Sequence, residues 1–309
     1  MTQAAVLITV LATSLLVVAQ AQSSASRPDS SSAPHNGTSN TGRPPVQTKT
    51  REEYKAYQAA VANEQSPEAM EKAADDFAAK FPNSDVRVLL YRAAMSSYQN
   101  AGNPDKMMNM GLKVLAIDKD DPEALIGIAE ILEERTGPTD LDRQQRSEQV
   151  VEYASHALKT LDTDLAIPAG TSPDRVDAYK KYLRSTALAI IGTIYYKQEH
   201  FAEAETKLRD AMETDAANPD PVVVLRLALA LDQQKKYPDA LEQANRAVEL
   251  TQEGTDLGRM ARNERDRLVV HSSGTGASAV GAASGNQPAP QNNAPANQAS
   301  PGTAYTPTH

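Results

Sequence analysis

Two short acidic stretches contain the residue types and spacings that could bind a metal ion. Glu199, His200 and Glu203 lie close enough in the chain for carboxylate and imidazole groups to share one ion. The stretch "DKDDPEALIGIAE", from Asp118 to Glu130, spaces its acids somewhat like a calcium loop, but it lacks the glycine of the sharp turn and continues as an apolar helix. Because short motifs of this kind often match by chance, both are interpreted as solvated turns. No metal or cofactor is predicted.

The other groupings that would indicate catalysis are not found in the sequence. It contains no Gly-rich phosphate loop, no His-Glu-x-x-His and no nucleophile elbow. Of its five histidines, three lie in low-complexity flanks, which leaves His156 and His200 in the body of the protein. The sequence therefore favours a protein that is not an enzyme.

The charge distribution argues against nucleic acid as a partner. The whole chain has 31 basic and 40 acidic residues, and removing the three basic and one acidic residues of the flanks leaves 28 and 39 between Arg51 and Val270, a net charge of −11. An acidic body without a basic stripe does not favour binding to phosphate backbones or anionic lipids. There is no cysteine, so disulfides cannot stabilise the fold.

The first 21 residues have the pattern of a secretory signal peptide. An apolar run from Ala4 to Val18 is followed by Ala19-Gln20-Ala21, a small-x-small cleavage pattern. The alternative is a permanent membrane anchor, but a helix of this run would cover roughly 22 Å at about 1.5 Å per residue, short of a bilayer core of about 30 Å. We expect cleavage after Ala21, no stable membrane span thereafter, and a periplasmic or extracellular location in a bacterium.

The segments 22–50 and 271–309 are low in complexity. The first is rich in Ser, Pro and Asn, and the second is rich in Gly, Ala, Pro, Gln and Asn. Neither segment can bury enough apolar surface to offset the entropy lost on ordering. Both are predicted to be disordered.

Between the flanks the hydrophobic pattern is helical. Apolar residues recur at intervals of three and four, and the runs are separated by turn signals such as "NAGNPD", "DKDDPEA", "IPAGTSPD" and "KKYPDA". Helices broken at such regular spacing indicate an internal repeat.

The stretch "IGTIYYKQEHFAEAETKLRDAMETD" contains the clearest repeating unit. Gly192 and Tyr195 share one face of a first helix, and Ala204 and Leu208 share one face of a second. Two antiparallel helices approach closely only where side chains are small. The backbones are therefore predicted to meet at Gly192 and Ala204, with Tyr195 and Leu208 filling the space beside them.

The same constellation recurs along the chain. Ala228 and Ala240 lie 36 residues after their counterparts in that unit, and Met95 and Ala129 occupy equivalent positions 34 residues apart. The unit that contains Ala129 is interrupted by "TGPTDLDRQQRSEQ", so its second helix begins late. A poorer copy spans residues 54–82.

A helical hairpin of this period resembles the tetratricopeptide repeat (TPR) family. The matching features are Gly-x-x-Tyr in the first helix, Ala-x-x-x-Leu-x-x-Ala in the second and a closing Asp/Pro turn, within "LAIIGTIYYKQEHFAEAETKLRDAMETDAANP". The resemblance implies an all-α fold, an α-solenoid of about five helical hairpins. The predicted units are 51–84, 88–121, 122–162, 173–218 and 221–254, followed by a capping helix at 256–270.

One unit departs from a plain array at its start. The stretch "DTDLAIPAGTSPDRVDAYKKYLRSTALAII" places a long loop before the fourth unit and extends its first helix. Ser172 is a suitable N-cap and Pro173 a suitable first helical residue, so this helix is predicted to run from Pro173 to about Gln198.

The resemblance also implies where a partner would bind. In TPR proteins the first helices line a concave surface that binds peptides or helices of partner proteins. The corresponding positions here form the predicted partner-binding groove: Arg92, Gln99, Asn100, Ile126, Glu130, Glu133, Thr193, Tyr196, Lys197, Leu225 and Leu229. Ser96 and Ala189 occupy two further positions of the same surface. A second interpretation applies to three of these residues, Tyr196, Leu225 and Leu229, which could instead pack against a neighbouring helix. The sequence does not decide between a role in the groove and a role in packing.

Three functions stay open at this stage. The favoured one is a non-catalytic scaffold of the cell envelope with a protein or peptide partner. The others are an accessory subunit of an envelope enzyme and a structural envelope protein tethered through its flanks. The Lys/Asn set with which some TPR proteins bind a C-terminal carboxylate is not found at the matching positions.

Overall fold

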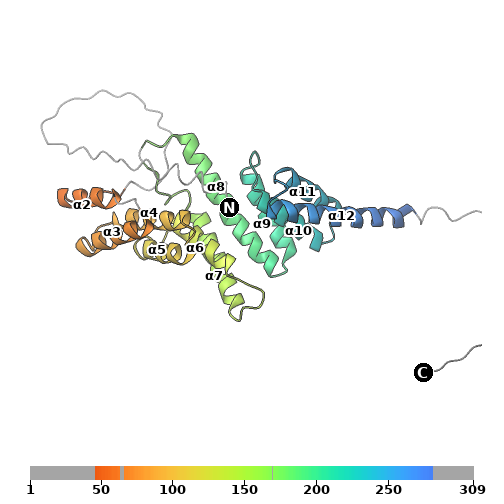
Figure 1. Ribbon diagram of the computed structural model, residues 1–309, viewed down its shortest axis with the longest axis horizontal. Coiled ribbons are helices and arrows are strands. Elements are labelled where there is room, and N and C mark those ends of the chain that lie inside the picture. The colour runs from red at the N-terminus through yellow and green to blue at the C-terminus, as the bar shows by residue number, and fades with distance from the viewer. Residues whose placement is uncertain (1–45, 63–65, 169, 281–309) are drawn as a thin grey trace, which may run out of the picture.

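The computed structural model describes residues 46–62, 66–168 and 170–280, with side chains up to residue 271. The predicted signal peptide, most of the predicted N-terminal linker and the tail beyond residue 280 lie outside the described residues. Every element in the described part is an α-helix (Figure 1): α2 (Arg51–Val61), α3 (Pro67–Lys80), α4 (Arg87–Asn100), α5 (Pro104–Ile117), α6 (Pro122–Glu134), α7 (Arg143–Thr160), α8 (Pro173–Lys197), α9 (Phe201–Thr214), α10 (Pro221–Gln233), α11 (Tyr237–Glu249) and α12 (Asp256–Val280).

The helices pack as successive hairpins. α2 packs on α3, α4 on α5, α6 on α7, α8 on α9 and α10 on α11, and neighbouring hairpins contact each other through α3 and α4, α5 and α6, α7 and α8, and α9 and α10. Figure 1 shows the hairpins following one another along the long axis, with α8 crossing the middle. The predicted all-α solenoid of five TPR-like hairpins is confirmed for the described residues.

Polar caps followed by proline define where many helices begin. Ser66, Asn103, Asp121 and Asp220 each accept a hydrogen bond from a backbone N–H two or three residues later, and each precedes a proline at the first helical position. Proline is tolerated there because that N–H would have no intrahelical acceptor. The predicted start of α8 is confirmed with Ser172 as the N-cap residue, although its side chain makes no capping hydrogen bond.

Three of the hairpin turns share one backbone conformation. The residue two positions past the first helix has a positive φ, of 66° at Gly102, 64° at Glu199 and 61° at Lys235. In each turn the next N–H donates to the carbonyl five residues earlier, at 2.9–3.0 Å. This is the hydrogen bond of a Schellman motif, which satisfies a carbonyl that the helix end leaves free. The segment with metal-like spacing at Glu199 and His200 is thus a repeat turn.

The predicted close approach of helices at Gly192 is confirmed. A Cβ atom placed on Gly192 would lie 2.8 Å from Leu208 Cγ and 3.3 Å from the Leu208 backbone nitrogen. Ala204 and Leu208 are fully buried on the facing helix. A similar contact occurs at Gly127, where a Cβ would lie 2.8 Å from Met107 Cε. Glycine is required at position 192, because a side chain there would meet the branch point and the backbone of Leu208. At position 127 the nearest atom is the terminal methyl group of Met107, which is flexible and can move aside.

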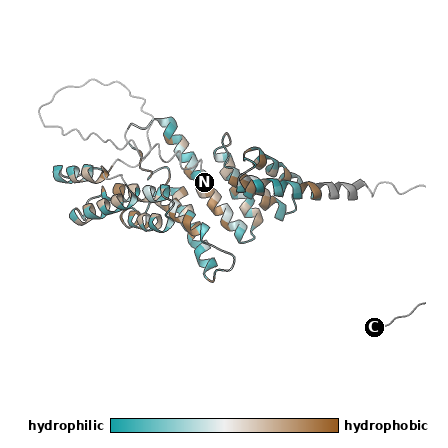
Figure 2. Cartoon of the chain, in the orientation of Figure 1, coloured by the Kyte–Doolittle hydropathy of each residue, from teal (hydrophilic) through white to brown (hydrophobic). Residues whose placement is uncertain are grey.

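The long helix α8 connects two parts of the core. It packs on α7 and α9 and also contacts α6 of the hairpin before it. Tyr179 and Leu183, near its start, belong to the same apolar cluster as Ile126, whereas Leu188 and Ala189 belong to the cluster of the following hairpins. Figure 2 shows the early turns of α8 as mainly hydrophilic and its later turns as more hydrophobic.

The last helix closes the array and is longer than predicted. α12 packs on α11 and α10, with Ala261 and Leu268 fully buried. It ends at Val280 rather than near 270, so the first residues of the tail that was predicted to be disordered are helical. In the described part of the chain, no helix has the length and apolar character that a bilayer crossing requires.

The close packing at Gly192 leads to a stability prediction. Gly192→Ala introduces a methyl group against Leu208 and is expected to lower the free energy of unfolding by about 1–3 kcal/mol, as overpacking does. Urea unfolding followed by circular dichroism measures this. Glu203→Ala, an exposed position on α9, is the control and should stay within about 0.5 kcal/mol of the wild type.

A second substitution distinguishes the steric effect from a change in helix propensity. Leu208→Ala removes the side chain that the new methyl group would meet. The double variant should therefore lose less stability than the sum of the two single variants. Equal stability of Gly192→Ala and Glu203→Ala would contradict the close approach.

Candidate functional site

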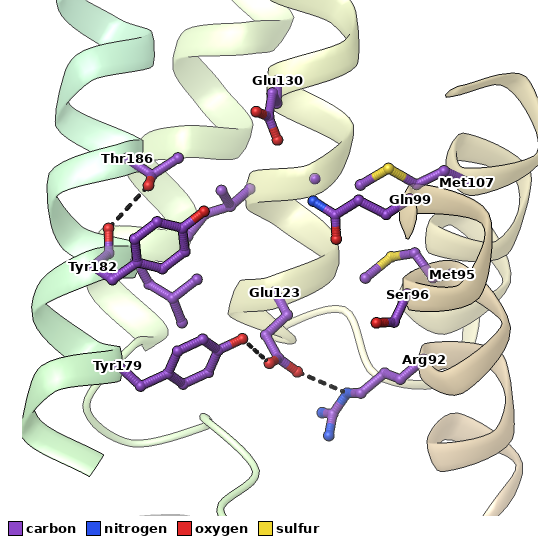
Figure 3. A pocket seen from close by; sticks show the side chains of 13 residues that line it. Arg92, Met95, Ser96, Gln99, Met107, Glu123, Glu130, Tyr179, Tyr182 and Thr186 are labelled. Atoms are coloured by element: carbon purple, nitrogen blue, oxygen red, sulfur yellow. Dashed lines mark hydrogen bonds and ion pairs between the residues drawn. The ribbon is translucent and has the colours of Figure 1, made fainter. Parts of the chain in front are cut away.

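A cavity of ≈ 80 Å³ lies between α4, α6 and α8, the first helices of three successive hairpins. It is bounded by polar, aromatic and thioether side chains (Figure 3). The residues that line it are Arg92, Met95, Ser96, Gln99, Met107, Glu123, Ile126, Gly127, Glu130, Tyr179, Tyr182, Leu183 and Thr186. Met107, on α5, is the one residue of this set from a second helix.

One end of the cavity is closed by a satisfied network of charges. Arg92 donates to Asp121, the buried N-cap of α6, which also accepts from the Ala124 backbone N–H at 2.9 Å. Arg92 Nε lies 3.8 Å from Glu123 Oε2, and the Tyr179 hydroxyl donates to the other oxygen of Glu123. Figure 3 shows this chain of contacts from α8 through α6 to α4. Each charge has a partner here, so the network joins the three helices and leaves little for a ligand to bind.

The other end of the cavity holds a carboxylate without a partner. Glu130 makes no hydrogen bond or ion pair with the residues that the structure describes, and burial raises the pKa of its carboxyl, as do the charges of Glu134 and Glu133. The Ser96 hydroxyl is buried and also has no hydrogen-bond partner among the described residues, but it lies nearer Arg92 (Figure 3). Figure 3 shows Glu130, Gln99 and Tyr182 directed toward one open space. This end is therefore the part of the surface that a ligand could satisfy.

The predicted groove residues do not form one continuous surface. Arg92, Gln99, Ile126 and Glu130 line the cavity. Asn100 is exposed at the end of α4, away from the cavity lining.

Two other predicted groove residues hold α8 to α6. Lys197 Nζ forms an ion pair of 2.7 Å with Glu133 Oε1 and donates to the Glu133 carbonyl at 2.6 Å and the Thr136 carbonyl at 3.2 Å. Glu133 is buried. Arg143 of the inserted segment also donates to the Lys197 carbonyl, at 2.9 Å. The prediction that Lys197 and Glu133 are free for a partner is corrected, because they satisfy each other.

The predicted groove residues of the last hairpin pack within the protein. Leu225 is buried and Leu229 half-buried, in a cluster with Leu257 and Ala261 of the capping region. Of the two interpretations left open by the sequence, the structure favours packing against α12. A hollow of ≈ 240 Å³ remains beside them, lined by Leu225, Leu229, Met260, Asn263, Glu264 and Arg267.

Thr193 and Tyr196 are also occupied by internal contacts. Thr193 is buried and its hydroxyl donates to the Ala189 carbonyl at 2.7 Å, which corrects its assignment to an open groove. Tyr196 is half-buried, with its ring 5.6 Å from that of Phe201 in an edge-to-face arrangement.

The sequence did not predict the contribution of α8 to the cavity. Tyr179, Tyr182, Leu183 and Thr186 all precede the stretch that matches the repeat pattern. The signal that could have identified them is the extension of this helix upstream to Pro173. Extra turns before the repeat position must lie alongside the preceding hairpin.

Neither acidic stretch with metal-like spacing is a metal site in the structure. In the described residues no group of three or more His, Cys, Asp and Glu side chains could hold a metal ion. His156 lies 2.8 Å from Asp120 and links α7 to the turn before α6.

Comparison with known proteins identifies solved structures of related shape. The chain aligns with TTC0263, a thermophilic TPR protein in Thermus thermophilus, at 15% identity over 69% of this chain and 98% of that one, with a TM-score of 0.41. It aligns with Pseudomonas aeruginosa PilF at 18% identity over 75% of this chain and 93% of that one, with a TM-score of 0.45. It aligns with MamA from Desulfovibrio magneticus at 18% identity over 64% of this chain and 97% of that one, with a TM-score of 0.37.

Sequence comparison adds no closer relative. No protein-family model matches the sequence, and no curated protein matches it. With TM-scores below 0.5, the structural alignments carry no weight of their own, and the fold assignment rests on the hairpins of this chain.

The isolated carboxyl of Glu130 leads to a pH-dependent prediction. The pKa of the Glu130 carboxyl is raised in the folded protein, so folding favours its protonated form. Stability is therefore lost as the pH rises from the ordinary pKa of 4.5 through the pKa in the folded protein. Glu130→Gln removes this loss. The variant should be more stable than the wild type at pH 7, by on the order of 1 kcal/mol, and the two should converge near pH 4.

Urea unfolding at pH 4, 5.5 and 7 measures this difference. Glu152→Gln makes the same charge change at an exposed position on α7 that does not act on Glu130, and it should shift stability by no more than about 0.5 kcal/mol. A Glu130→Gln variant less stable than the wild type at pH 7 would show that the carboxylate has a favourable partner.

Proposed function

We propose that this protein is a non-catalytic scaffold of the cell envelope that binds a peptide or helix of a partner protein. The binding surface is the face formed by α4, α6 and α8. The observation that supports this most directly is the cavity itself, where Glu130 lacks a partner beside the ring of Tyr182, and the buried Ser96 hydroxyl lacks one further along, beside Met95. Exposed apolar area with a few unsatisfied polar groups is typical of a peptide-binding surface.

The size of the cavity favours a side chain over a free small molecule. Pockets for small-molecule ligands usually measure about 300–1,000 Å³, whereas this one measures ≈ 80 Å³. A space of that volume accommodates the end of one side chain, with the rest of the partner lying across the helices outside. The surface is made by three hairpins, which provides a long platform for such a segment.

The envelope location rests on the N-terminal sequence. An apolar run that ends in Ala-x-Ala within the first 21 residues is typical of a signal peptide, and the chain contains no cysteine. Export would place a disulfide-free solenoid in the periplasm or outside the cell. Its stability there would come from helix packing alone.

The proposed binding surface is tested by truncating one of its aromatic residues. Tyr182→Ala is expected to weaken capture of the native partner by about tenfold, the typical effect of removing a hot-spot side chain. Capture is measured with the immobilised full-length protein and quantitative mass spectrometry of the envelope fraction. Tyr153→Ala is the matched control, because Tyr153 is a half-buried tyrosine on α7 that does not line the cavity.

The outcome separates binding from folding. Both tyrosine variants lose comparable packing, so their melting temperatures should fall together while only Tyr182→Ala loses the partner. Equal capture by the two variants would place the binding surface elsewhere on the molecule.

Export is tested by the mass of the mature protein. Cleavage after Ala21 would give a chain that begins at Gln22. Intact-mass measurement of the protein from its native host should match that chain. A species that retains Met1 to Ala21 would contradict cleavage, and recovery of that species with the membrane fraction would support the anchor alternative.

A further inference from the structure

The open end of the cavity contains one group that can only accept hydrogen bonds. The Glu130 carboxylate is acceptor-only when ionised, whereas the Gln99 amide and the Tyr182 hydroxyl can donate or accept. The cation that lines the cavity, Arg92, lies at the opposite end and is already paired with Asp121. A group that satisfies Glu130 must therefore supply donors.

The electrostatic environment selects a positive charge. Among the groups that act on the Glu130 carboxyl, three are acids, and Arg226 is the one cation. Tyr182 lines the same space as Glu130, and its hydroxyl is directed toward it (Figure 3). An anionic ligand would add to this repulsion, whereas a cation would supply the missing partner of a partly buried carboxylate.

The apolar lining selects a planar and weakly hydrated cation. Met95, Met107 and the Tyr182 ring border the same space. A guanidinium group is planar, stacks on aromatic and thioether groups, and presents five N–H donors in a fixed fork. Ammonium is more strongly hydrated, so its entry into this narrow space would cost more. A metal ion is disfavoured because the described residues do not bring together three suitable ligands.

We infer that the cavity between α4, α6 and α8 binds the guanidinium group of an arginine in a partner peptide. The carboxylate of Glu130 pairs with the guanidinium, the Gln99 carbonyl accepts another of its N–H groups, and Tyr182 lies against its plane. The inference rests on the proposed function and specifies the chemistry of its partner. The net charge of −11 between residues 51 and 270 also favours a basic segment.

The test uses a short capped peptide, acetyl-Gly-Gly-Arg-Gly-Gly-amide, and the same peptide with citrulline, a neutral isostere of arginine. The protein is labelled with ¹³C at its methionine methyl groups, because Met95 and Met107 line the cavity whereas Met260 lies on α12. We expect the arginine peptide to shift the signals of Met95 and Met107 with saturation and to leave Met260 unchanged. The citrulline peptide should bind at least tenfold more weakly, because it lacks the charge-assisted hydrogen bonds.

Variants assign the effect to the carboxylate of Glu130. Glu130→Gln should abolish the preference for arginine over citrulline, whereas Glu152→Gln, the same charge change at an exposed position on α7, should change the Kd less than twofold. Gln99→Leu provides a second test within the cavity and should weaken arginine binding severalfold. Both cavity variants are compared with the wild type by their circular dichroism spectra.

The result distinguishes this inference from the function on which it rests. Equal binding of the two peptides, shifts that include Met260, or no binding of either peptide would overturn the arginine assignment. An unchanged preference in Glu130→Gln would also overturn it. If Tyr182→Ala nevertheless loses the partner in any of these cases, the scaffold function is still supported, and the group that binds in the cavity is not an arginine side chain.

Discussion

The structure depends on how closely its helices can approach one another. Where α8 meets α9, the absence of a side chain at Gly192 lets Leu208 lie in the space that a Cβ would occupy. Where α6 meets α5, Gly127 accommodates Met107 in the same way. Gly127 and Met107 both line the cavity between α4, α6 and α8, so this close contact forms part of the cavity wall.

Several charged residues in this molecule join helices that are not consecutive. Arg92 connects α4 to the start of α6, Lys197 connects the end of α8 to the end of α6, and Arg267 of α12 pairs with Asp232 of α10 at 2.5 Å. Such partly buried pairs add little net stability, but they penalise a wrong register because an unpaired buried charge is costly. Against this pattern of paired charges, Glu130 is an exception. An unsatisfied carboxylate in an otherwise paired interior is the type of local conflict that functional sites often contain.

The sequence predicted the local parts of this fold better than the contacts between distant parts. Small residues such as Gly192 and Ala204, and caps such as Ser172, follow from spacing and backbone chemistry within one hairpin, and the structure confirms them. The environment of Leu225 depends on α12, which arrives from further along the chain and covers it. Thr193 and Glu133 have polar side chains typical of a surface, yet partners on the same or a neighbouring helix satisfy them in the interior. Part of the cavity wall comes from turns of α8 that lie outside the repeat pattern, so repeat alignment could not place it.

The length of α8 has a consequence for how the molecule unfolds. In an array whose hairpins contact only their immediate neighbours, terminal hairpins can detach one at a time, and the remainder keeps its structure. Here one helix of 25 residues is shared, because side chains along it from Tyr179 to Ile194 belong to the core that includes α6 and α7, and Leu188 and Ala189 belong to the core of the following hairpins. Fraying from either end should therefore stop at α8. We expect the middle of the chain to unfold as a single cooperative block, from which the outer hairpins can open first.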